Sequence, residues 1–158
     1  MEYNPYALTG KTILVTGASS GIGRAVAIEC SRLGAHVILS ARNKEKLEET
    51  LKMMEGHGHQ VIECDLSNEK EVSLLIDEVP EIQGLVNNAG TTMTVPVPFI
   101  KFNVLSDLLK VNTIAPIMIL SGLVKKKKLR ANSSVVFTSS VSGLGRVSPG
   151  NTMYAATK

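Results

Sequence analysis

Residues 16–23 read Thr-Gly-Ala-Ser-Ser-Gly-Ile-Gly and lie between an apolar run, Ile-Leu-Val at 13–15, and a helix-like segment at 22–33. Glycine suits such a turn because it tolerates positive φ and lets a ligand approach bare backbone. The following helix offers free N–H groups to a phosphate. A glycine pattern alone is weak evidence, but a strand before it and a helix after it strengthen it. The stretch therefore predicts a dinucleotide site rather than a glycine-rich turn without a ligand.

The rest of the chain alternates short apolar runs with longer helical patterns. Each run is continuous, as expected for strands that are covered on both faces. The predicted strands lie at 13–15, 37–39, 61–62, 85–86 and 135–137, and the predicted helices at 22–33, 44–54, 68–79 and 107 to about 127. Strands alternating with helices predict an α/β fold, a Rossmann-type doubly wound parallel sheet with right-handed crossovers.

Local signals set the expected ends of these helices. Gly34 follows the first helix, as glycine often does at a helix C-terminus. Asn43 is the expected cap of the second helix, Ser67 of the third and Ser106 of the fourth. Residues 91–98 form the one long irregular loop that the pattern predicts.

The composition is that of a single globular domain. The chain has 158 residues, 44% apolar and 20% charged, with a net charge of +3 and no tryptophan. These values do not favour nucleic acid as a partner. The start has no signal-peptide pattern, and the apolar run at 114–120 is too short to span a bilayer. We expect no membrane partner and a cytoplasmic location.

Two other features have ordinary interpretations. Cys30 and Cys64 lack metal-ligand spacing and are expected to be reduced, mostly buried thiols, so no metal site is predicted. The basic run Lys125–Arg130 could be a nuclear signal or an anion patch. Its position favours the solvated C-terminus of the fourth helix, where cations meet the negative end of the helix dipole.

The end of the second strand bears on the choice of cofactor. Dinucleotide folds usually place an acid there to hold the adenosine ribose. This chain instead has Ala41 and Arg42, and an arginine can pair with a 2′-phosphate that an acid would repel. Ser19 could add a hydroxyl contact. We therefore expect NADP(H) rather than NAD(H), unless Arg42 is only a surface charge.

Three further motifs follow in order: Asn-Asn-Ala-Gly at 87–90, Ser-Ser-Val-Ser-Gly at 139–143 and Tyr-Ala-Ala-Thr-Lys at 154–158. Together with the glycine stretch they resemble the short-chain dehydrogenase/reductase family, of the shorter type with a Thr-Gly-x-x-x-Gly-x-Gly loop. The resemblance covers Lys11 to Lys158. It implies hydride transfer between a nicotinamide and the carbonyl or alcohol carbon of a small-molecule substrate, which the sequence does not identify further.

The resemblance also implies a set of cofactor-binding residues. Asp65, followed by Leu66 in Cys-Asp-Leu, matches the segment at the adenine ring. The full set comprises Gly17, Ser19, Ser20, Gly21, Ile22, Gly23, Arg42, Asp65, Leu66, Asn88, Ala89, Gly90, Tyr154 and Lys158.

The implied catalytic residues are Ser140, Tyr154, Lys158 and Asn112. Tyrosine is a poor acid–base group at neutral pH, but an ammonium one helical turn away favours the phenolate. Ser140 is preferred to Ser139 because the family places the catalytic serine three residues before a glycine. Pro116 has no N–H, so the carbonyl of Asn112 is expected to stay free in mid-helix, where the family uses it to hold a water.

The pattern contains five strands, whereas the full dinucleotide fold has six. We therefore expect 1–158 to be a single NAD(P)-binding domain that is incomplete at its C-terminus and inactive alone, with a longer parent that is a homo-oligomer. Two alternatives remain open. One is an NADP-binding regulatory protein without turnover, and the other is an epimerase or dehydratase of the extended type.

Overall fold

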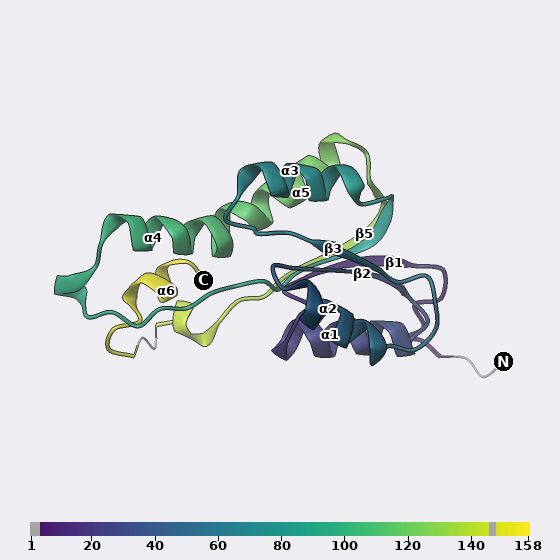
Figure 1. Ribbon diagram of the computed structural model, residues 1–158, viewed down its shortest axis with the longest axis horizontal. Coiled ribbons are helices and arrows are strands. Elements are labelled where there is room, and N and C mark those ends of the chain that lie inside the picture. The colour runs from purple at the N-terminus through teal and green to yellow at the C-terminus, as the bar shows by residue number, and fades with distance from the viewer. Residues whose placement is uncertain (1–3, 146–147) are drawn as a thin grey trace.

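The computed structural model describes residues 4–145 and 148–158. Its centre is one parallel sheet with strand order β3-β2-β1-β4-β5 (Figure 1). The strands are β1 (Thr12–Thr16), β2 (His36–Ala41), β3 (Gln60–Glu63), β4 (Ile82–Asn87) and β5 (Leu129–Phe137). Each contains the apolar run predicted for it, and the Rossmann-type parallel sheet is confirmed.

Helices cover both faces of this sheet (Figure 1). On one face lie α1 (Gly21–Arg32) and α2 (Lys44–Lys52), and on the other α3 (Glu69–Glu78) and α5 (Ala115–Lys125). Successive residues of a strand point to opposite faces, so Leu14 belongs to the core under α3 and α5 while Val15 belongs to the core under α1 and α2. This explains the continuous apolar runs of β1, β2 and β4, whereas the run of the edge strand β5 is largely exposed.

The expected cap of the second helix is confirmed and two others are wrong. Asn43 Oδ1 accepts a hydrogen bond from Lys46 N at 2.7 Å. The third helix is capped by Asn68, whose side chain accepts from Lys70 N, because Ser67 is already bonded to Asp65 Oδ1 through its N–H and its hydroxyl.

The fourth helical segment begins earlier than expected, at Phe102 rather than Asp107. It comprises α4 (Phe102–Leu109), a π-helical turn η2 (Lys110–Ile114) and α5. Its N-cap is Lys101, which makes no side-chain capping bond, so the sequence carried no signal at the true start. Ser106, the expected cap, lies inside α4.

This continuous 24-residue helix, Phe102–Lys125, is long and apolar enough by length and composition to cross a membrane, which the short run at 114–120 did not suggest. Its apolar residues have another partner. Ala115, Ile119 and Leu123 are buried in the core that α3 and β4 share. Packing against the sheet therefore accounts for part of its apolar character, whereas Ile117, Met118 and Val124 are exposed.

Shorter elements complete the described chain. The loop expected at 91–98 is irregular up to the single turn η1 (Val97–Phe99). After β5 come the 3-10 turn η3 (Val141–Gly143) and the short helix α6 (Thr152–Ala156), which lies beside α4 (Figure 1).

The basic run begins at the end of α5, as expected, but its last lysine caps the C-terminus of a neighbouring helix, α3. Lys128 Nζ donates to the carbonyl oxygens of Ile76, Asp77 and Val79 at 2.9, 2.6 and 2.5 Å, at the C-terminus of α3. Lys126 pairs with the Asp77 carboxylate, which holds the pKa of Asp77 below its ordinary value. The run thus joins α3 to the turn between α5 and β5.

We predict that Lys128→Met lowers the free energy of unfolding by about 1–2 kcal/mol, because three carbonyl groups at a helix end lose a charged donor. Urea unfolding followed by circular dichroism measures the change. Lys125→Met, an exposed lysine of the same run, is the matched control. Equal stability of the two variants would contradict a capping role for Lys128.

Candidate functional site

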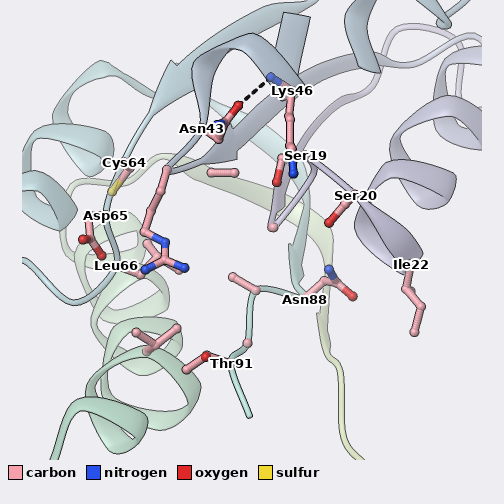
Figure 2. Close-up of a pocket in the computed structure, with 16 residues that line it drawn as sticks. Ser19, Ser20, Ile22, Asn43, Lys46, Cys64, Asp65, Leu66, Asn88 and Thr91 are labelled. Carbon is pink, nitrogen blue, oxygen red and sulfur yellow. Dashed lines mark hydrogen bonds between the residues drawn. The ribbon is translucent and has the colours of Figure 1, made fainter. Parts of the chain in front are cut away.

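The carboxyl ends of β1 and β4 meet at the point where the chain's crossovers diverge to the two sides of the sheet. In open α/β sheets this switch point is where ligands bind. A cavity of about 470 Å³ opens there (Figure 2). Ten of the predicted cofactor residues line it: Gly17, Ser19, Ser20, Ile22, Arg42, Asp65, Leu66, Asn88, Ala89 and Gly90.

The glycine turn is shaped by φ angles and by lack of space. Gly17 and Gly21 have φ of 69° and 55°. Gly23 has ordinary φ, but a Cβ there would overlap the carbonyl oxygen of Gly17 and lie 2.5 Å from Asn88 Nδ2. Gly23 therefore lets α1 start directly against the turn after β4, although it does not line the cavity itself.

Thr16 joins the two turns by hydrogen bonds. Its Oγ1 accepts from the N–H of Asn88 at 3.1 Å and from the N–H of Ala89 at 3.2 Å. The Asn88 side chain donates to the carbonyl of Thr16 and accepts from the Thr138 hydroxyl, both at 3.4 Å. The Asn-Asn-Ala-Gly segment is thus fixed between β1 and β5.

Sequence reasoning missed part of the cavity wall, most importantly Lys46. The wall also includes Ala41, Asn43, Cys64, Thr91 and Val111. Lys46 lies in the first turn of α2, next to Ser19 (Figure 2). A sequence signal for Lys46 existed: the Asn43 cap predicts a helix that starts at Lys44, which places Lys46 in its first turn, close to Arg42. Across residues 4–145 and 148–158, neither Arg42 nor Lys46 forms an ion pair.

Asn112 is the centre of a second cluster. Its buried side chain accepts from Thr91 N and donates to Thr91 O, both at 2.8 Å, and donates to Thr157 Oγ1 at 2.9 Å. It lies in the π-helical turn, where the N–H of Ala115 bonds five residues back to Lys110 O. The free carbonyl expected at Asn112 stays a prediction.

Lys158 lies next to this cluster and next to Gly90. Its Nζ donates to Thr138 O at 3.0 Å, and a Cβ on Gly90 would lie 3.4 Å from that Nζ. Tyr154 is half-buried on α6, one helical turn before Lys158. The structure therefore brings Lys158, Asn112 and the end of the Asn-Asn-Ala-Gly segment together.

The two candidate serines have different partners. Ser139 Oγ donates to the carbonyl of Lys158 at 3.3 Å. Ser140 Oγ accepts from Ser142 N at 3.2 Å and caps η3, so its own proton can go to another acceptor. Ser139, not Ser140, lines the cavity beside Lys158, so the choice of Ser140 stays a prediction.

A second cavity of about 270 Å³ adjoins this cluster, with Lys158, Asn112 and Ser139 in its wall. Asn87, the first residue of Asn-Asn-Ala-Gly, also lines it. The residue is 96% buried, and within the described residues neither polar atom of its side-chain amide has a hydrogen-bond partner. Nothing in the sequence marked Asn87 as different from its neighbours.

Both cysteines are free, as expected, and Cys64 is the more buried. Burial, followed by the charges of Glu71, Asp65 and Glu78, raises the pKa of the Cys64 thiol to about 12. The sulfur is thus a neutral part of the cavity wall.

Comparison with known proteins now gives the family. The sequence model of the short chain dehydrogenases matches residues 11–158. This chain belongs to the short-chain dehydrogenase/reductase family. It is 34% identical over 151 residues to the 3-oxoacyl-(acyl-carrier-protein) reductase FabG of Rickettsia felis, and 35% identical over 166 residues to the 3-ketodihydrosphingosine reductase of Mus musculus.

The matched region is nearly the whole of this chain and a part of its relatives. The two alignments cover 96% and 98% of this chain but 62% and 49% of the reductases. A solved short chain dehydrogenase of Escherichia coli CFT073, in complex with NADPH, aligns with a TM-score of 0.85 at 32% identity, over 96% of this chain and 67% of that one.

We predict that Cys64 resists alkylation in the folded protein at pH 8, because burial leaves almost no thiolate at the surface. Peptide mapping after timed exposure to iodoacetamide measures the rate at Cys64, and Cys30 in the same sample serves as the half-buried reference. Both should react equally in urea. Fast native labelling of Cys64 would contradict this description of the cavity wall.

Proposed function

We propose that the whole protein is an NADP(H)-dependent oxidoreductase. It would transfer a hydride between the nicotinamide and a ketone or secondary alcohol, as in a 3-oxoacyl or other ketone reductase. One observation carries this proposal: Gly90 lies both in the wall of the larger cavity and against Lys158. The nucleotide cavity and the Asn112–Lys158 cluster are therefore adjacent. The reductases among the relatives support the reaction class.

The residues present fit a dinucleotide. The bare backbone of Gly17 and Gly23 leaves no room for side chains between the loop and β4, and the N-terminus of the 12-residue helix α1 follows. Such a helix end favours a phosphate. The bound cofactor would supply or accept the hydride. Asp65 and Leu66 would border the adenine, and Asn88, Ala89 and Gly90 the adenosine ribose.

The preference for NADP(H) rests on two cations. Arg42 and Lys46 both line the cavity, with Ser19 beside Lys46 (Figure 2). A 2′-phosphate carries negative charge that pairs favourably with guanidinium and ammonium groups. At this end of β2 the chain has no carboxylate to hold a ribose hydroxyl. The NADPH-bound relative supports the same preference.

The catalytic roles that we propose rest on the second cluster for Asn112 and Lys158, and on the family's motifs for Tyr154 and Ser140. Tyr154 would exchange the proton with the substrate oxygen, and Lys158 would favour its phenolate and contact the nicotinamide ribose. Ser140 would hold the substrate oxygen by its free hydroxyl proton. Asn112 would fix Thr157 and hence the end of the helix that carries Tyr154, next to Lys158. The presence of all four residues makes a regulatory protein without turnover, or an extended-type epimerase, less well supported.

Further features of the whole protein are also proposals. Ile117, Met118 and Val124 are exposed on α5, which supports a homo-oligomer. The two free thiols support a reducing compartment such as the cytoplasm. We propose a single nucleotide-binding domain for residues 1–158.

We predict that Tyr154→Phe in the whole protein lowers kcat at least a hundredfold while the Kd for NADPH changes less than about threefold. Positioned acid–base groups contribute about that much to rate, whereas the loop and the two cations hold the cofactor. Steady-state assays with a ketone panel and fluorescence titration measure the two quantities. Tyr6→Phe, at an exposed tyrosine far from the cavity, is the control. A variant that keeps a tenth of wild-type kcat would exclude Tyr154 as the acid.

We also predict that Arg42→Asp shifts preference from NADPH toward NADH, because it removes a partner of the phosphate and adds an acceptor for a ribose hydroxyl. Arg42→Ala should weaken NADPH binding about tenfold or more without improving NADH binding. Titration of each variant with both cofactors measures this. An unchanged ratio in both would place the 2′-phosphate elsewhere.

A further inference from the structure

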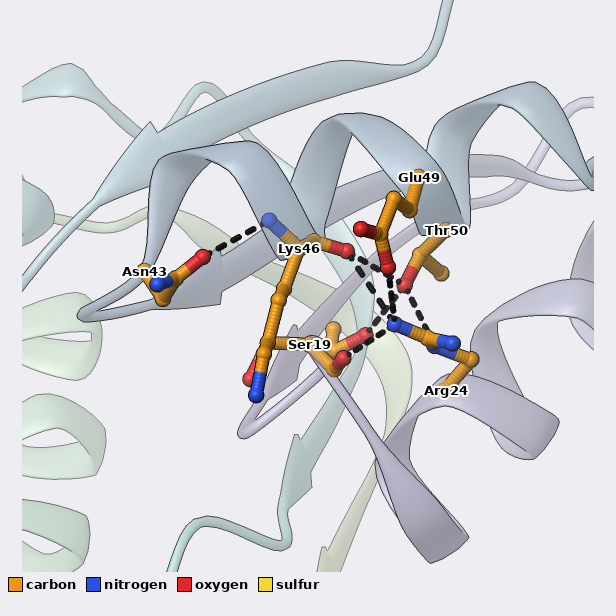
Figure 3. A network of polar contacts seen from close by, with 7 residues as sticks. Ser19, Arg24, Asn43, Lys46, Glu49 and Thr50 are labelled. Atoms are coloured by element: carbon orange, nitrogen blue, oxygen red, sulfur yellow. Dashed lines mark hydrogen bonds and ion pairs between the residues drawn. The ribbon is translucent and has the colours of Figure 1, made fainter.

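Two residues that do not line the nucleotide cavity, Arg24 of α1 and Thr50 of α2, form hydrogen bonds with the backbone of the glycine turn (Figure 3). Thr50 is fully buried, and the Arg24 side chain is 25% exposed. Neither has a role in the proposed reaction.

Their contacts converge on two carbonyl groups of the turn. Arg24 Nη2 donates to the carbonyl of Ser19 at 2.6 Å, and Thr50 Oγ1 lies 3.0 Å from the carbonyl of Ala18. Arg24 Nε also donates to Thr50 Oγ1 at 3.0 Å, so the two side chains form one connected unit. Glu49 holds the guanidinium from the solvent side at 3.2 Å.

These carbonyls fix the direction of the next N–H groups in the turn, those of Ser19 and Ser20, two residues that line the cavity. In a planar trans peptide the C=O and N–H point in opposite directions. Holding the Ala18 carbonyl toward α2 therefore turns the N–H of Ser19 away from α2, and holding the Ser19 carbonyl does the same for the N–H of Ser20. Within the described chain neither N–H has a protein acceptor, so both are open to an anion.

The same unit also fixes α2 relative to the turn. The carbonyl of Lys46 lies 3.0 Å from Thr50 Oγ1 and 3.4 Å from Arg24 Nη2, and the N–H of Lys46 is bonded to the Asn43 cap. The Lys46 side chain runs from this anchored backbone alongside Ser19 (Figure 3). The Thr50 hydroxyl has one proton, which it can give to either the Ala18 or the Lys46 carbonyl at a time.

We propose that Arg24 and Thr50 are positioning residues for the cofactor's 2′-phosphate. They set the spacing between the Ser19 N–H and the ammonium of Lys46, and the phosphate binds between these two groups beside Arg42. This inference rests on the proposed NADP(H) preference. It concerns residues that touch only the loop and α2, and it predicts an effect on NADPH that is larger than the effect on NADH, because NADH carries an uncharged hydroxyl where NADPH carries the phosphate.

The experiment compares Thr50→Val with Thr50→Ser in the whole protein. Valine keeps the shape but removes the hydroxyl, whereas serine keeps the hydroxyl. Titration with NADPH and NADH should show a three- to tenfold fall in the ratio of their affinities for Thr50→Val, as expected for one lost hydrogen bond, and a ratio near wild type for Thr50→Ser. The KM for NADPH should rise in Thr50→Val while kcat at saturating cofactor stays unchanged.

A second pair of variants tests the inference at a partly exposed residue, in case Thr50→Val fails to fold. Arg24→Met should lower the same ratio, whereas Arg32→Met, at an exposed arginine at the other end of α1, should not. A purely structural role would weaken both cofactors in proportion and leave the ratio constant, which would overturn the inference. If the wild type itself prefers NADH, the proposed cofactor preference fails and the inference fails with it. If the wild type prefers NADPH and Arg24→Met keeps that ratio, only the inference fails.

Discussion

The site depends on the close approach of two backbone turns, one after β1 and one after β4. A Cβ on Gly17 would lie 2.8 Å from the Cα of Ala89, and one on Gly23 would overlap the carbonyl of Gly17. With only hydrogen atoms in this gap, the Thr16 hydroxyl can reach the N–H groups of Asn88 and Ala89. The cavity at the switch point exists because these turns are in contact rather than separated by side chains.

The same contact connects cofactor binding with the proposed chemistry. The chain leaves the β4 turn through Gly90 and Thr91, and Asn112 bonds both backbone groups of Thr91. Through Thr157, Asn112 also holds α6, which carries Tyr154. A displacement of the β4 turn would therefore move the cavity wall and α6, with Tyr154, together. We infer that the four motifs act as one geometric unit, although they are far apart in sequence.

Much of this arrangement could be predicted from sequence, because the decisive signals are local. Continuous apolar runs gave the strands, and a parallel sheet necessarily gathers the motifs at one edge. The start of the fourth helix was missed because Lys101 provides no capping side chain. Arg24 and Thr50 were missed for a different reason. Their importance comes from contacts between α1, α2 and the turn, which no spacing along the chain reveals.

The cations near the cavity differ in what they contact. One is bonded to other protein groups, and two are available to bind a ligand. Arg24 bonds two carbonyl groups, the Thr50 hydroxyl and the Glu49 carboxylate, so much of its charge and donor capacity is used within the protein. Within the described chain, Arg42 and Lys46 are exposed and form no ion pair. An anion would gain little from a guanidinium that is already neutralised, but much from two unpaired cations on a fixed frame. If the protein prefers NADP(H) as proposed, recognition of the 2′-phosphate would use both kinds of cation: one that is paired and sets the geometry, and others that are free to bind.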